Sequence, residues 1–193
     1  MSVYQGTLVD RAWPTAGTAA DAVRAVALII FGSLLMTVGA KIEVPFFPVP
    51  MTMQTFALVL LIGCYGGRLA AASVGLYLVQ GLAGMPVFAA PVAAGLVYFQ
   101  GPTGGYLIGF LVAAAVGGWL VDRSKGAGVI RMAAILTLSI AIVFVCGLAW
   151  LSTLVGFSNA IQFGFVPFVL GDIVKIALAT AVIAGASQMV KPS

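Results

Sequence analysis

The sequence predicts an all-α integral membrane protein in which about six transmembrane helices form a single bundle. Hydrophobic residues make up 62% of the chain, charged residues only 7%, and the mean hydropathy is +1.18. A soluble domain carries roughly 25% charged residues, so this composition indicates a membrane environment. The chain of 193 residues has room for about six crossings of roughly 20 residues each, and we expect one domain over residues 1–193.

The apolar runs divide the chain into six expected spans joined by short loops. The first run has Asp21 and Arg24 at its start and is nearly 20 residues long, which is longer than the apolar core of a typical secretory signal. Gly66, Gly67 and Arg68 separate the second run from the third, and both runs are short for a bilayer crossing. The expected spans are approximately 22–40, 51–65, 69–82, 104–121, 132–155 and 166–190.

Basic residues alternate between the two sides of these spans. The opposite loops contain Lys41, whereas the basic residues on the first side are Arg11, Arg68, Arg123, Lys125, Arg131 and Lys191. Because Lys and Arg favour the cytoplasmic side of a membrane, both termini are predicted to be cytoplasmic and the chain to be a multi-pass protein of the cell membrane, in contact with lipid. Scattered basic residues near helix ends are not the footprint of nucleic-acid binding, despite the net charge of +4.

One charged pair, Asp172 and Lys175, lies inside the apolar run 163–190. A charge near the bilayer centre costs on the order of 3 kcal/mol or more, so such a pair indicates a role. A spacing of three puts both side chains on one helix face, roughly one to three turns below the outer surface. Three roles are open: a structural ion pair, a proton relay, and, favoured here, a ligand-binding pocket open to the outside.

A small residue occupies every fourth position from 101 to 117. This spacing makes a smooth ridge along one helix, where another backbone can approach closely. Packing within the bundle is favoured over a partner interface. The ridge consists of Gly101, Gly105, Gly109, Ala113 and Gly117.

Catalytic and metal chemistry find little support in the sequence. His is absent, which removes the commonest general base and metal ligand. Cys64 and Cys146 lack a C-x-x-C spacing, and no Walker A pattern is present. We therefore expect no metal, no cofactor and no enzymatic activity, and any ATP hydrolysis must come from a partner.

Four segments together resemble the BioY family of biotin transporters, which are the substrate-binding S components of energy-coupling factor (ECF) transporters. The segments, in order, are PVPMTMQT at 48–55, GLAGMPVF at 81–88, GPTGGYL at 101–107 and PFVLGDIVK at 167–175. The resemblance covers nearly the whole chain and implies a bundle of six helices that holds biotin near its outer face. It also implies two kinds of partner, a transmembrane coupling subunit and two ABC-type ATPase subunits.

The resemblance implies that Asp172 and Lys175 supply polar contacts to biotin. A carboxylate accepts from the ureido N–H groups and an ammonium donates to an oxygen, so either end of the vitamin can face Lys175. The segment 89–96 has no polar side chain, unlike the corresponding stretch of some family members. The other expected binding residues are Phe47, Tyr98, Tyr106 and Gln100. The alternative function is a stand-alone, proton-coupled carrier of a small vitamin-like substrate.

Overall fold

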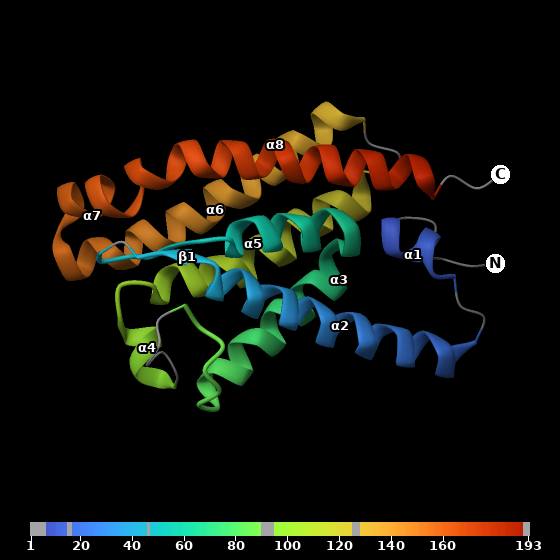
Figure 1. Cartoon of the computed structure of the whole chain (residues 1–193), viewed down its shortest axis with the longest axis horizontal. Coiled ribbons are helices and arrows are strands. Elements are labelled where there is room, and N and C mark those ends of the chain that lie inside the picture. Colours follow the sequence, from blue (N-terminus) through green and yellow to red (C-terminus); the bar gives the residue numbers. More distant parts are fainter. Residues whose placement is uncertain (1–6, 15–16, 46, 90–94, 125–127, 191–193) are drawn as a thin grey trace.

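The computed structural model describes residues 7–14, 17–45, 47–89, 95–124 and 128–190, and these residues form an elongated helical bundle (Figure 1). Two short strands, β1 (Glu43–Val44) and β2 (Met51–Thr52), form an antiparallel pair. The helices are α1 (Leu8–Ala12), α2 (Thr18–Lys41), α3 (Gln54–Leu82), α4 (Leu96–Gln100), α5 (Gly104–Arg123), α6 (Val129–Val155), α7 (Phe157–Gly164) and α8 (Val166–Met189). Helix α1 and the end of α8 lie at one end of the bundle, and α4 and α7 lie at the other.

Five helices within the described residues are long and apolar enough to cross a membrane, namely α2, α3, α5, α6 and α8. The predicted all-helical membrane architecture agrees with this finding, and the count of six crossings stays a prediction. The expected spans 51–65 and 69–82 both fall within α3, whose two helical halves are separated by non-helical backbone at Gly66. The first of them begins too early, since residues 51–52 pair with β1 and the helix starts at Gln54.

Helix α3 contains a sharp reversal at Gly66. This residue has φ 73° and ψ −175°, a conformation that glycine adopts readily and other residues avoid. A hydrogen bond between the two halves of the helix shows the effect of this reversal. Gln54 Nε2 donates to the Tyr77 hydroxyl oxygen at 2.7 Å, although the two residues are 23 positions apart. In a straight helix that separation corresponds to about 35 Å, so the two halves of α3 must run back along each other (Figure 1).

The part of the ridge that lies in α5 packs against α6, as the prediction of internal packing requires, whereas Gly101 precedes α5 and lies against α4. A Cβ added at Gly109 would lie 3.0 Å from Val143 Cα, and one added at Gly105 would lie 2.6 Å from the Cys146 carbonyl oxygen. Such spacing leaves no room for a side chain, so the two helix backbones touch almost directly. Helix α5 therefore forms the centre of the bundle, between α3 and α6.

Two segments expected as loops contain short helices. Helix α4 lies between α3 and α5, and α7 lies between α6 and α8, both at the end of the bundle that also carries β1 and β2 (Figure 1). The polar start of α3 is tied to this end, because Gln54 N donates to the Thr52 hydroxyl oxygen at 3.2 Å. These elements bring side chains from distant parts of the chain around one cavity.

Candidate ligand pocket

A cavity lies between β2 and the helices α3, α4, α5, α6 and α8. Its internal volume is about 50 Å³, and the space between its walls is about 530 Å³ when the solvent at its open mouth is included. Its lining divides into a polar end and an aromatic wall. The polar side chains are Thr52, Gln54, Thr55, Thr103, Asp172 and Lys175, and the apolar and aromatic ones are Val49, Pro50, Ala89, Tyr98, Tyr106, Leu107, Phe110, Val143, Phe144 and Phe168.

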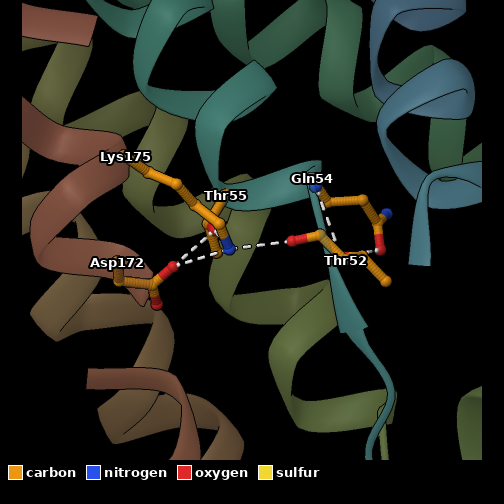
Figure 2. A network of polar contacts seen from close by, with 5 residues as sticks. All are labelled: Thr52, Gln54, Thr55, Asp172 and Lys175. Atoms are coloured by element: carbon orange, nitrogen blue, oxygen red, sulfur yellow. Dashed lines mark hydrogen bonds and ion pairs between the residues drawn. The ribbon is translucent and has the colours of Figure 1, made fainter. Parts of the chain in front are cut away.

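The polar end is built around the ammonium of Lys175 (Figure 2). Lys175 Nζ donates to the Thr52 carbonyl oxygen at 2.8 Å, to Thr55 Oγ1 at 2.9 Å and to Asp172 Oδ1 at 3.0 Å. A lysine ammonium has three N–H donors, so all of them have protein acceptors. The charge of Lys175 is therefore neutralised by Asp172 and its donors are occupied.

The two oxygens of the Asp172 carboxylate have different surroundings. Oδ1 accepts from Lys175 and also from the Thr55 hydroxyl at 2.7 Å. Oδ2 is buried and has no hydrogen-bond partner among the described residues. Since a buried acceptor without a donor is unfavourable by about 1–3 kcal/mol or more, Oδ2 is a site where a ligand donor would be bound strongly. The Asp172 side chain is only 4% exposed.

The sequence explains why these groups meet. Asp172 and Lys175 lie three residues apart on α8, and the ion pair at 3.0 Å confirms that they share one helix face. Thr55 lies in the first turn of α3, three residues after Thr52, which ends strand β2. Gln54 is held by Tyr77 on the returning half of α3, so the reversal at Gly66 fixes the start of the helix beside the ion pair.

Aromatic side chains form much of the remaining lining. The Tyr106 hydroxyl donates to the Gly164 carbonyl oxygen at 2.8 Å, which presents the ring of Tyr106 to the cavity. Phe144 contacts Tyr106 and Phe168 edge to face. Tyr98 of α4 stacks on the fully buried Phe88, with 4.8 Å between ring centroids. These rings offer an apolar surface to a compact ring system.

The cavity contains four of the six expected binding residues, Asp172, Lys175, Tyr98 and Tyr106. The structure does not bring Phe47 or Gln100 to it. The Phe47 side chain is 91% exposed, and Gln100 is exposed at the end of α4. Phe47 is expected at the site for its place in a predicted external loop, and Gln100 as a polar side chain close to the apolar segment 89–96, but neither position fixes the direction of a side chain.

Several lining residues were not predicted as binding residues. Thr52 and Thr55 lie within the segment 48–55 that carries the family resemblance, so their hydroxyl groups beside a helix start were a usable signal. Phe110, Phe144 and Phe168 lie in apolar spans and have no feature that separates them from core residues. Of the segment 89–96, Ala89 lines the cavity, whereas residues 90–94 are outside the described part of the chain.

The fold and the cavity together define a helical membrane protein with a pocket for a small, partly polar ligand. A crystal structure described as the S-component for biotin from an ECF-type ABC transporter has the same fold, with a TM-score of 0.74 and 23% identity over 92% of this chain and 97% of that one. The sequence model of the BioY family matches residues 11–192, and the chain belongs to this family.

Relatives of similar length support the assignment. The protein described as probable biotin transporter BioY of Pyrococcus horikoshii is 36% identical over 157 residues, which cover 81% of this chain and 92% of the relative. The biotin transporter BioY of Thermotoga maritima is 35% identical over 149 residues, which cover 77% of this chain and 86% of the relative. The alignments therefore extend over most of both proteins.

Proposed function

We propose that this protein binds biotin at the outer face of the cytoplasmic membrane and delivers it inward as the S component of an ECF-type transporter. The observation that carries the proposal is the unpaired Oδ2 of Asp172 at the polar end of an aromatic-walled pocket. Family membership and the names of the relatives support it.

The chemistry of biotin complements this pocket. Its ureido group carries N–H donors, which suit the Asp172 oxygen, and its thioether ring is apolar and suits the faces of Tyr98, Tyr106 and Phe168. Lys175 neutralises the carboxylate beside the ligand, and its three N–H donors are held by protein acceptors. We assign substrate binding to Asp172, Lys175, Tyr98 and Tyr106, and leave Phe47 and Gln100 out because they do not line the cavity.

We further propose six membrane crossings, with the two halves of α3 as separate crossings and both termini in the cytoplasm. The reversal at Gly66 and the alternation of basic residues support this topology. Reporter fusions at Arg68, within 125–127 and after Lys191 should be cytoplasmic, and a fusion at Asn159 should be external. An external signal from 125–127 would contradict the topology.

As an S component, the protein is a substrate-binding subunit rather than an enzyme. Its sequence has no Walker A pattern, so active uptake requires a transmembrane coupling subunit and two ABC-type ATPase subunits. The direct test is equilibrium binding of labelled biotin to the purified chain, with unlabelled biotin as competitor. Saturable binding supports the proposal, and binding no greater than to an unrelated membrane protein overturns it.

The second candidate is a stand-alone, proton-coupled carrier, which the buried carboxylate of Asp172 favours. Uptake by cells that lack every ECF ATPase separates the two functions. A carrier takes up biotin in these cells and depends on the proton gradient, whereas an S component takes up biotin actively only when the ATPase and coupling subunits are also expressed.

A further inference from the structure

The hydroxyl of Thr55 lies at the centre of the polar end of the pocket, between the two charged side chains (Figure 2). It donates to Asp172 Oδ1 at 2.7 Å and accepts from Lys175 Nζ at 2.9 Å. Thr55 belongs to α3, whereas the charged pair belongs to α8. One hydroxyl group therefore joins the two helices through both of its hydrogen-bonding functions.

This arrangement determines which carboxylate oxygen remains for a ligand. Oδ1 receives two donors, from Thr55 and Lys175, and Oδ2 receives none among the described residues. Lys175 alone, one helical turn away on the same helix, has no means of fixing the rotation of the carboxylate, since either oxygen can serve as its acceptor. The Thr55 hydroxyl approaches from α3 and so selects Oδ1.

We propose that Thr55 is a positioning residue for ligand recognition: its hydroxyl orients the Asp172 carboxylate so that Oδ2 faces an N–H donor of the ligand. This inference rests on the proposed function, because it assigns the ligand donor to biotin. Thr55 also holds Lys175 toward the Thr52 carbonyl oxygen, which keeps the ammonium directed away from Oδ2. Loss of the hydroxyl frees both groups, and Oδ2 can then turn toward the ammonium.

The test compares Thr55→Val with Thr55→Ser. Valine keeps the shape of threonine and lacks the hydroxyl, whereas serine keeps the hydroxyl and lacks only the methyl group. Thr180→Val is the control, because Thr180 is buried on α8 and, among the described residues, its hydroxyl donates within its own helix, to the Ile176 carbonyl oxygen at 2.7 Å. Biotin affinity, the dissociation rate and the melting temperature are measured for each purified variant.

Thr55→Val should weaken biotin binding by at least about tenfold, mainly through faster dissociation, because hydrogen bonds to charged groups are among the stronger ones. Thr55→Ser should bind within about threefold of the parent, and Thr180→Val should bind like the parent even if its melting temperature falls. Thr55→Ala takes the place of the valine variant if the latter does not fold.

Native biotin affinity in a folded variant without the Thr55 hydroxyl overturns the inference and leaves the proposed function intact, since the parent still binds. Equal losses in Thr55→Ser and Thr55→Val also overturn it, because packing of the methyl group would then account for the effect. A parent protein that does not bind biotin overturns both the inference and the proposed function.

Discussion

Replacement of Asp172 by Asn distinguishes a binding carboxylate from a merely structural one. The amide keeps the shape of the side chain but has only one acceptor oxygen. If that oxygen occupies the Oδ1 position, it still accepts from Thr55 and Lys175, and the NH₂ group then replaces Oδ2 and faces the donor of the ligand. If the amide is flipped, the NH₂ group meets two donors inside the protein.

Both orientations of the amide are unfavourable, and the charge of Lys175 is left without its counter-ion. A hydrogen bond to a charged group contributes about 1.5–3 kcal/mol, so biotin affinity should fall by roughly ten- to a hundredfold. Separately, breaking a buried ion pair lowers the free energy of unfolding by about 3–5 kcal/mol. Combining Asp172→Asn with Lys175→Gln removes both charges, so the double variant should be more stable than Asp172→Asn alone and still bind weakly.

The assay is equilibrium binding of biotin to purified protein, with the melting temperature measured on the same samples to separate lost affinity from lost folding. Native affinity in the folded double variant would refute the ligand role of both residues and leave the structural ion pair as the explanation. Normal binding by Asp172→Asn with loss of only the pH dependence of uptake would favour the proton-coupled carrier.

Two further substitutions test the packing around the pocket. Gly109→Leu should lower the melting temperature and reduce the free energy of unfolding by about 1–3 kcal/mol or more, because a Cβ added at this position already lies 3.0 Å from Val143 Cα. Unchanged stability together with failed transport would instead indicate that the ridge is a surface for a partner. Phe88→Ala should lower the free energy of unfolding by about 3–5 kcal/mol and weaken biotin binding, because it removes the fully buried ring on which Tyr98 stacks. Chemical denaturation and biotin titration measure both effects, and biotin affinity unchanged in folded Phe88→Ala would show that this stacking does not shape the pocket.

The sequence predicts best those features that a single helix determines. The shared face of Asp172 and Lys175 follows from their spacing alone, and the ridge that includes Gly109 follows from a period of four. Gly66 and Gly67 also mark the position where the chain reverses between the two halves of α3. These local signals are sufficient to predict such features because, in a helix, the number of residues between two positions determines whether their side chains lie on the same face.

Features that depend on contacts between distant segments could not be predicted in the same way. Tyr98 and Phe47 are both aromatic and both lie beside predicted loops, yet one lines the cavity and the other is almost fully exposed. Tyr98 of α4 is held by stacking on Phe88, which lies in the segment after α3. Phe47 has no ring contact among the described residues. Which partner a side chain meets is a property of the fold and not of spacing.

Helix α8 is buried in the bundle along only one face. A narrow stripe that includes Phe168, Asp172 and Ile183 faces the bundle, whereas Leu170, Val174 and other large apolar residues of the helix are exposed in the isolated chain. In a membrane, acyl chains complete the surroundings of this helix. The helix that carries Asp172 therefore lies between protein on one side and lipid on the other, and we expect bilayer thickness and lateral pressure to affect ligand affinity together with the pocket itself.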